Sequence, residues 1–200
     1  MNPTIDDHAT RFDRMAAEYD DLDRPVYAAC RDVVIEAAAP TPEDTVLDLG
    51  TGTGAIALHL ATQADRVIGR DISDQMLEEA RTKAEAAGRS NVDFGKGRFR
   101  SPNVDTHVDI VTSNYAMHHL SDAEKREAIG VIAQFEPRRF VLGDVMLFGD
   151  APPTDPAYDT EVDDPATVGH LVTALTDCGF VITDVVQVTD QAGVIVSEMQ

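Results

Sequence analysis

A glycine-rich turn is the feature of this chain whose residue types and spacing point most directly to chemistry. The stretch Val46–Leu60, VLDLGTGTGAIALHL, places an apolar strand before the turn and an apolar helical pattern after it. Glycines allow backbone dihedrals and close contacts that a side chain would block, and a helix beginning near Gly54 presents unpaired N–H groups. The turn is therefore predicted to hold a ligand against the backbone.

Two acidic residues narrow the kind of ligand. Asp71 ends the next predicted strand, VIGRD, and in nucleotide-binding α/β folds an acid about 20 residues beyond the glycine turn binds the ribose hydroxyls. Asp48 precedes the first glycine of the turn, where it would repel a pyrophosphate and attract a cationic amino-acid group. Gly50, Gly52 and Ala55 also fit a dinucleotide fingerprint, and Asp48 argues against that alternative.

Length and composition predict a folded globule. A chain of 200 residues with 43% hydrophobic content suits one domain, residues 1–200, in which a helical cap (1–40) precedes an α/β core (41–200). No apolar run reaches membrane-spanning length, and the N-terminal MNPTIDDHAT lacks the features of a signal peptide. We therefore expect a cytoplasmic protein with no membrane partner.

The net charge of −20 is extreme, and Lys83, Lys96 and Lys125 are the only lysines. Such an acidic, lysine-poor composition resembles proteins of salt-in halophilic archaea, whose charged surfaces keep them soluble. An alternative is that the acid selects a cationic substrate. Either way, direct binding of nucleic acid is disfavoured, because no basic stripe would neutralise phosphates. Cys30 and Cys178 are predicted to be buried thiols without metal spacing.

Helical and strand patterns alternate through most of the chain, which predicts a parallel sheet with helices on both faces. Helical spacing covers residues 8–19, 26–38, 73–87, 121–135 and 164–179, and strand patterns cover 91–94, 108–113 and 140–147 in addition to the two strands above. Residues 151–164 form a proline- and acid-rich loop. The last two strand patterns, 180–188 and 193–199, are close enough to form a hairpin.

Four motifs resemble those of class I S-adenosylmethionine-dependent methyltransferases of the small-molecule type. They are RFDRMAAEYDD (11–21), DLGTGTG (48–54), IGRDIS (68–73) and DIVTSNYAMHHL (109–120). The resemblance implies a Rossmann-like, doubly wound, mostly parallel seven-stranded sheet with a C-terminal antiparallel hairpin and an N-terminal helical cap. It also implies S-adenosylmethionine as the cofactor and S-adenosylhomocysteine as the product.

The resemblance assigns roles to residues at the carboxyl ends of the strands. By this resemblance, the glycine turn would bind the methionine part of the cofactor and Asp71 would bind the ribose. Ile72 would pack against the adenine. The cofactor-binding candidates are Tyr19, Asp48, Gly50, Thr51, Gly52, Gly54, Asp71, Ile72, Gly97, Arg98 and Asn114. Two residues depart from the family pattern: Arg98 stands where relatives carry the acid that binds adenine, and Arg70 replaces an apolar residue. The alternative for Tyr19 is packing, with Phe12 and Met15 as core residues.

The residues after the fourth strand are candidates for the methyl-acceptor side. Tyr115 and His118 are the catalytic candidates, because imidazole can deprotonate an acceptor near neutral pH. Methyl transfer chiefly requires alignment and desolvation, so a base is not required. Packing is the equal alternative for His118 and the preferred interpretation for His119. Adjacent histidines are poor metal ligands and no third ligand has suitable spacing, so no metal is predicted. Asp144 is a further pocket candidate.

These observations predict a methyltransferase that uses S-adenosylmethionine to methylate a small molecule. One alternative is an RNA or protein methyltransferase that depends on a partner for docking. Another is a non-catalytic, cofactor-binding regulatory protein, because Arg98 departs from the family pattern. A nicotinamide-dependent oxidoreductase fits less well, since Asp48 and the terminal hairpin both argue against it. The methyl acceptor and the oligomeric state are not specified by the sequence.

Overall fold

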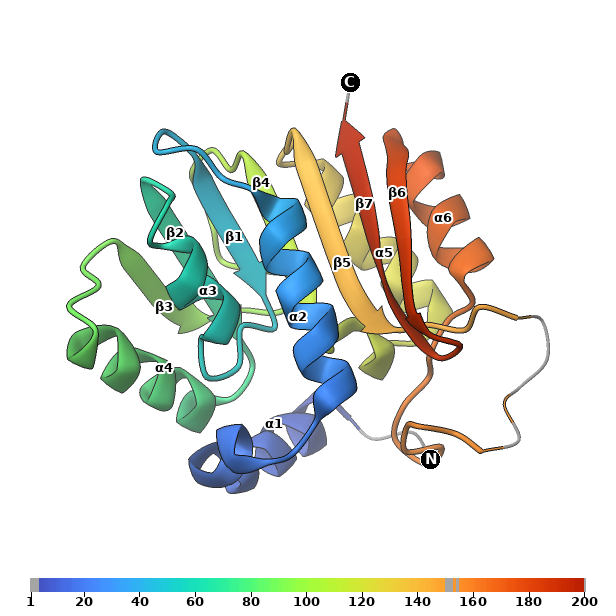
Figure 1. Ribbon diagram of the computed structural model, residues 1–200, viewed down its shortest axis with the longest axis horizontal. Helices are drawn as coiled ribbons and strands as arrows, with labels where there is room; N and C mark the ends of the chain where they lie inside the picture. The colour runs from blue at the N-terminus through green and yellow to red at the C-terminus, as the bar shows by residue number, and fades with distance from the viewer. Residues whose placement is uncertain (1–3, 150–152, 154, 200) are drawn as a thin grey trace.

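The protein is built on one seven-stranded sheet with the strand order β3-β2-β1-β4-β5-β7-β6 (Figure 1). The structure is a computed structural model that describes residues 4–149, 153 and 155–199. The strands are β1 (Thr45–Leu49), β2 (Arg66–Asp71), β3 (Val92–Lys96), β4 (Ile110–Asn114), β5 (Arg139–Val145), β6 (Phe180–Thr189) and β7 (Ala192–Met199). Strands β1 to β5 pair in parallel, and β7 is antiparallel to both β5 and β6. The predicted Rossmann-like sheet with a terminal hairpin is confirmed.

Helices cover both faces of the sheet. They are α1 (Ile5–Met15), α2 (Pro25–Ala38), α3 (Ala55–Leu60), α4 (Asp74–Ala86), α5 (Asp122–Ala133) and α6 (Val168–Asp177), with the short 3₁₀ helices η1 (Ala16–Asp21) and η2 (Met117–His119). One apolar core lies between the sheet and α2, α3 and α4, and a second lies between the sheet and α5 and α6. No helix in the described part of the chain is long and apolar enough to cross a membrane.

Strand β1 shows why the central strands are apolar on both faces. Its neighbouring residues Val46 and Leu47 are both fully buried, Val46 in the first core and Leu47 in the second. Successive side chains of a strand point to opposite faces, so a strand covered by helices on both sides needs apolar residues throughout. The buried polar residues of β1, β2, β4 and β5 lie from the middle of each strand to its carboxyl end: Asp48, Arg70, Asp71, Thr112, Ser113, Asn114 and Asp144.

Helix beginnings follow the capping residues that the sequence contains. Ser121 accepts a hydrogen bond from the backbone N–H of Glu124, whose side chain in turn accepts one from the backbone N–H of Ser121, which is the predicted capping box. Ser73 caps α4 by accepting from the N–H of Met76. These local hydrogen bonds satisfy backbone donors that the first helical turn leaves free.

The predicted start of the last helix at Asp164 is wrong. Helix α6 begins after Thr167, whose hydroxyl accepts a hydrogen bond from the N–H of His170. The backbone of Asp164 is engaged elsewhere: its N–H donates to the carbonyl of His118, and its carbonyl accepts from the buried Lys125 ammonium. These contacts hold residue 164 outside the helix. Of the predicted loop, residues 151, 152 and 154 lie outside the described residues.

The N-terminal segment also differs from its prediction in detail. The expected helix over residues 8–19 begins earlier, at Ile5, and passes into η1 after Met15. Phe12 and Met15 are half-buried rather than core residues, and so is Cys178, whereas Cys30 is fully buried as predicted. Residues 1–3 of the predicted cap and Gln200 of the predicted core lie outside the described residues.

Asp48 ties the carboxyl end of β1 to its surroundings. Its Oδ2 accepts a hydrogen bond from the Thr51 hydroxyl (2.6 Å) in the glycine turn, and its Oδ1 accepts one from the Thr112 hydroxyl (2.7 Å) in β4. Burial, which disfavours the charged form, raises the pKa of Asp48 to about 6, although these hydrogen bonds lower it. The carboxylate therefore binds its proton more tightly in the folded protein than in the unfolded chain.

This raised pKa predicts a pH dependence of stability that Asp48→Asn removes. An unfolded aspartate has a pKa of about 3.9, so the contribution of Asp48 to the free energy of unfolding falls as the pH rises from about 4 to about 6 and is constant above that. Relative to Asp48→Asn, the natural protein should lose about 2–3 kcal/mol of stability across this window. Urea denaturation at fixed salt concentration measures it.

A matched control is Asp105→Asn, which removes an exposed carboxylate. The difference between this variant and the natural protein should change little over the same pH range. A flat difference for Asp48→Asn between pH 4 and pH 7 would show that the buried carboxylate is not the group that titrates.

Candidate active site

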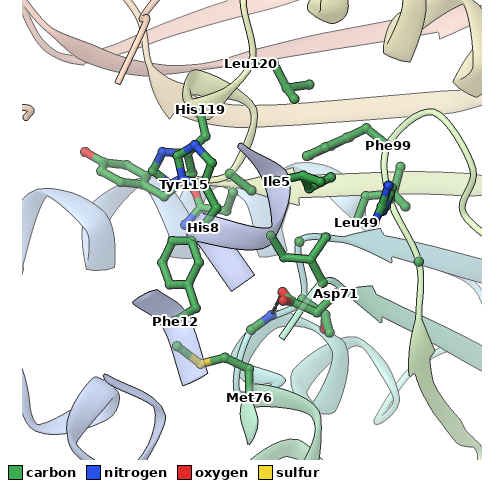
Figure 2. Close-up of a pocket in the computed structure, with 18 of the residues that line it drawn as sticks. Ile5, His8, Phe12, Leu49, Asp71, Met76, Phe99, Tyr115, His119 and Leu120 are labelled. Atoms are coloured by element: carbon green, nitrogen blue, oxygen red, sulfur yellow. Dashed lines mark hydrogen bonds between the residues drawn. The ribbon is translucent and has the colours of Figure 1, made fainter. Parts of the chain in front are cut away.

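A pocket lies where the carboxyl ends of β1, β2 and β4 meet the N-terminal helices. Its walls come from the glycine turn, the segments after β2, β3 and β4, and the helices α1 and α2, with residue 19 of η1 (Figure 2). His8 and Phe12 of α1 lie to the left of Asp71 in this view, and Ile5 of the same helix lies above it. Open α/β sheets bind ligands in this position, outside the carboxyl ends of neighbouring strands.

Most of the predicted site residues line this pocket. Those that do are Tyr19, Gly50, Thr51, Gly52, Asp71, Ile72, Gly97, Arg98, Asn114 and Tyr115. Asp48, Gly54 and His118 are not among the described residues that line it. The topology thus brings together five chain segments, and three of the candidates do not line the pocket.

The glycine turn packs closely against Ala116 because Gly50 has no side chain. Gly50 has a φ of +70°, and a Cβ at this position would lie 2.4 Å from the Cβ of Ala116. Its N–H donates to the carbonyl of Arg70 in β2, which fixes the turn over the strand ends. Gly54 allows the turn to pack closely against another side chain, since a Cβ there would lie 2.9 Å from the Phe94 ring.

The Asp71 carboxylate lies on the floor of the pocket and holds the turn in place. Its Oδ2 accepts a hydrogen bond from the N–H of Gly52 (2.8 Å), and its Oδ1 accepts one from the N–H of Ser73 (2.9 Å). Burial raises the pKa of Asp71 above its ordinary value, although both hydrogen bonds oppose that shift. Each carboxylate oxygen can accept a second hydrogen bond. The pocket side of Asp71 can therefore bind hydroxyl groups.

Asp48 reaches the pocket only through Thr51. Thr112 and Thr51 each donate to one of its oxygens, and its side chain is buried behind the turn. Thr51 itself lines the pocket. Asp48 does not form part of the pocket surface. From the strand end, its charge can still attract a cation bound in the pocket.

The two arginines that depart from the family pattern have different surroundings. Arg98 lines the pocket with its side chain half exposed, and its guanidinium lies 3.7 Å from the Asp6 carboxylate. Arg70 is buried and points away from the ribose position: its guanidinium donates to the Asp93 carboxylate (2.9 Å) and to the carbonyl of Gly69. Arg70 therefore stabilises the β2–β3 edge.

Asn114 ends β4 with a side-chain amide that has no hydrogen-bond partner among the described residues. Both its Oδ1 and its Nδ2 are buried and unpartnered, and the residue is 7% exposed. A buried polar group without a partner costs about 1–3 kcal/mol. Asn114 lines the pocket, and its Oδ1 is directed at Gly143, where a Cβ would lie 2.4 Å away. The amide would therefore have to turn to meet a ligand with donor and acceptor groups.

Tyr115 follows directly and stands in a left-handed backbone conformation, with a φ of +55°. Its ring packs edge-on against Tyr27, with centroids 5.4 Å apart. Burial raises the pKa of Tyr115, and the neighbouring Cys30 thiol contributes to that shift. The phenol therefore stays neutral near pH 7, so it can hydrogen-bond to a substrate but is poorly suited to remove a proton.

The adjacent histidines occupy different positions. His119 lines the pocket, where its ring lies near those of His8 (5.0 Å between centroids) and Phe12 (5.4 Å). His118 is buried behind it, with Nδ1 2.5 Å from Oδ1 of Asp144. Burial alone would lower the pKa of His118, but the Asp144 carboxylate outweighs burial and raises it.

Several pocket residues were missed in the sequence. Ile5, His8 and Phe12 share one face of α1, and their helical spacing predicts packing against the fold without indicating that a cavity lies between. Tyr19 had two interpretations, and its ring lines the pocket while the Arg24 guanidinium stacks 3.9 Å from the ring centroid. Such contacts between distant segments depend on the tertiary structure.

The region that contains the glycine turn is similar in sequence to known methyltransferases. Residues 46–135 match the model of a methyltransferase domain family. The chain is 36% identical over 155 residues to an uncharacterized methyltransferase of Bacillus subtilis, YcgJ, covering 75% of this chain and 58% of that relative. The chain spans about three-fifths of the length of curated relatives such as this one.

Solved structures share the fold. The crystal structure of YcgJ matches with a TM-score of 0.67 and 27% identity, covering 80% of this chain and 71% of that one. A DhpI complex with S-adenosylhomocysteine has a TM-score of 0.75 and 21% identity, covering 98% and 96% of the two chains. A complex of the Haloferax volcanii Trm112 methyltransferase activator with a methyltransferase also scores 0.75 at 20% identity, covering 94% and 96%.

The sequence match covers the glycine turn, Asp71 and the residues after β4. It does not include the residues of α1, η1 and α2 that also line the pocket. Over the matched region the chain is similar to methyltransferase domains, and its fold is shared by solved methyltransferase structures.

Proposed function

We propose that this protein binds S-adenosylmethionine in the pocket and transfers its methyl group to a small molecule. The observation that carries the proposal is the convergence of three features on one cavity: the open glycine turn, the Asp71 carboxylate and the unpartnered Asn114 amide. A ligand with ribose hydroxyls at one end and an amino acid at the other would provide partners for all three.

Each part of the cofactor has a proposed contact. The ribose hydroxyls donate to the free lone pairs of Asp71, and Ile72 packs against the adenine with Gly97 and Arg98 beside it. The methionine end lies along Gly50, Thr51 and Gly52 and hydrogen-bonds to Asn114, while Asp48 and Gly54 support the turn from behind. Tyr19 closes the pocket from the N-terminal side. Arg98 in place of an acid would contact adenine differently from relatives that carry the acid.

The methyl acceptor is proposed to be a small molecule because N-terminal side chains cover the pocket. His8, Phe12, Tyr19 and Tyr27 all line it, so a macromolecule would have to reach the cofactor past them. Their apolar and aromatic surfaces suit an acceptor of modest size with an apolar part. This arrangement also excludes water from the reacting atoms.

S-adenosylmethionine would supply the methyl group: as the acceptor atom formed its bond to the methyl carbon, the bond from that carbon to sulfur would break, leaving S-adenosylhomocysteine and, from a protonated acceptor, one proton. Tyr115 would orient the acceptor through its neutral hydroxyl, and His119 would hydrogen-bond to the acceptor through Nε2, with the released proton passing to solvent. His118, held by Asp144, would position His119 from behind. Alignment supplies most of the rate enhancement.

A partner-dependent RNA or protein methyltransferase is the alternative that the comparisons raise, because one of the fold's relatives is bound to the Trm112 activator. The two proposals differ in which fraction of a cell extract becomes methylated. With methyl-labelled S-adenosylmethionine, the small-acceptor proposal predicts label in the low-molecular-weight fraction. Label found only in RNA or protein, and only after a partner is added, would favour the alternative. Cofactor binding without any label transfer would favour a non-catalytic, regulatory protein.

Asp71→Asn should weaken binding of S-adenosylhomocysteine by about 10- to 100-fold, because charge-assisted hydrogen bonds to the ribose are lost. The amide of the variant would also face an N–H of the turn, so some loss of folding stability is expected as well. Titration calorimetry in high-salt buffer measures affinity, and thermal unfolding measures stability.

The control for Asp71→Asn is Asp65→Asn, which removes one exposed carboxylate from the same chain. It should leave both affinity and stability close to those of the natural protein. An Asp71→Asn protein that is folded and binds S-adenosylhomocysteine normally would show that the ribose lies elsewhere.

Asn114→Ala should weaken binding of S-adenosylhomocysteine by about tenfold without lowering the unfolding temperature of the ligand-free protein. The reason is that the amide has no partner to lose until a ligand arrives. Asn91→Ala is the matched control, because the Asn91 amide donates to the carbonyls of Ala61 and Ala64. That variant should lose stability and keep its affinity. If Asn114→Ala instead lowered the unfolding temperature and kept its affinity for S-adenosylhomocysteine, Asn114 would be a structural residue.

A further inference from the structure

We propose that His118, His119 and Asp163 form a binding site for a divalent transition-metal ion, with Zn²⁺ as the best fit. One ligand atom from each residue lies within 4.8 Å of the other two. Oδ1 of Asp163 is 2.8 Å from Nδ1 of His119 and 3.9 Å from Nε2 of His118. Zinc–ligand bonds of about 2.0–2.2 Å place neighbouring ligand atoms at such separations.

His118 is already oriented as a metal ligand. Its Nδ1 faces Oδ1 of Asp144 at 2.5 Å, which leaves Nε2 as the nitrogen directed towards Asp163. Metal-binding histidines regularly donate their other ring N–H to a carboxylate, which fixes the tautomer and makes the ligand nitrogen more basic. Asp144 would thus be the supporting carboxylate, and it does not itself face the ion.

The other two ligand atoms are paired only with each other. Nδ1 of His119 and Oδ1 of Asp163 lie 2.8 Å apart, and neither makes a hydrogen bond to any other residue that the structure describes. The side chain of Asp163 is only 8% exposed. A buried carboxylate oxygen and a buried imidazole nitrogen directed at the same point are satisfied by a shared cation.

The backbone holds Asp163 at this point. The N–H of Asp163 donates to the carbonyl of Asp159 (2.7 Å), and the N–H of Asp164 donates to the carbonyl of His118 (2.8 Å). The Lys125 ammonium also donates to the carbonyl of Asp164. The long segment before α6 is therefore tied to η2 next to the three side chains, so the site needs no large rearrangement to form.

The donor set favours a particular class of ion. Two imidazole nitrogens and one carboxylate oxygen suit Zn²⁺ and related transition metals better than Mg²⁺ or Ca²⁺, which prefer oxygen ligands. Three protein ligands leave a fourth position open in a tetrahedral zinc site. His119 also lines the pocket, so the ion would lie at the pocket wall.

Sequence spacing could not find this site. The prediction of no metal rested on the absence of a third ligand near the adjacent histidines, and Asp163 comes from a distant loop. The structure supplies the third ligand by folding residues 159–164 back against η2.

The test is metal binding by tag-free protein stripped with chelator. Zn²⁺ is titrated in competition with a chromogenic chelator, and Co²⁺ is used as a spectroscopic probe of coordination number. We expect one equivalent of Zn²⁺ to bind, with an upward shift of the unfolding temperature. Asp163→Asn and His119→Gln should each weaken binding at least tenfold, and Asp144→Asn should weaken it about 10- to 100-fold.

His107→Gln is the matched control. His107 also faces a carboxylate, with Nε2 3.0 Å from Oδ1 of Asp109, but its side chain is 72% exposed. This variant should bind Zn²⁺ as the natural protein does. Failure of the natural protein to bind an equivalent of Zn²⁺ or Co²⁺ would overturn the proposal whether or not the variants fold. Binding that His107→Gln weakens as much as His119→Gln does would overturn it too.

Discussion

The Asp71 carboxylate is the group on which the arrangement of the pocket depends. One oxygen accepts from Gly52 in the glycine turn, and the other accepts from Ser73 at the start of α4. The Ser73 hydroxyl in turn donates to the Asp13 carboxylate of α1 at 2.6 Å. A short series of hydrogen bonds thus connects the turn, β2, α4 and the N-terminal helix that covers the pocket. Asp71 organises this pocket as well as facing it.

Negative charge is concentrated behind this pocket. Asp48 and Asp71 are both buried beside the glycine turn, and burial raises the pKa of each. The proximity of Asp71 is a further cause of the raised pKa of Asp48. Carboxylates that pay a desolvation cost are stabilised by a nearby cation. A ligand that carries a sulfonium and an ammonium group would meet this need, whereas a pyrophosphate would add to the repulsion.

The parts of the fold that could be predicted from the sequence are those with a local cause. The strand, turn and helix around Gly50 follow from apolar runs and glycine spacing, and the helix after Ser121 follows from its capping box. The terminal hairpin follows from two strand patterns with a short connection. The predicted start of α6 was wrong because the contacts of Asp164 with His118 and Lys125 hold this residue outside the helix, although an aspartate followed by proline is typical of a helix start.

The candidate site was predictable to the same extent. Asp71 and Asn114 stand at strand ends, so the topology of a parallel sheet brings them together. The contribution of His8 depends on where α1 packs, and that of Asp163 depends on how a long loop returns to η2. Neither has a signal in residue spacing. The halophilic origin and the cytoplasmic location stay predictions, because they concern the surroundings of the protein rather than its fold.

The central claim is that the pocket accepts a cationic adenosyl ligand. Its most direct test is calorimetric titration of the natural protein, in high-salt buffer, with S-adenosylmethionine, S-adenosylhomocysteine and a nicotinamide dinucleotide. The account predicts that the first two bind with one-to-one stoichiometry and that the dinucleotide does not. Binding of the dinucleotide, or binding of none of the three by a protein shown to be folded, would contradict it.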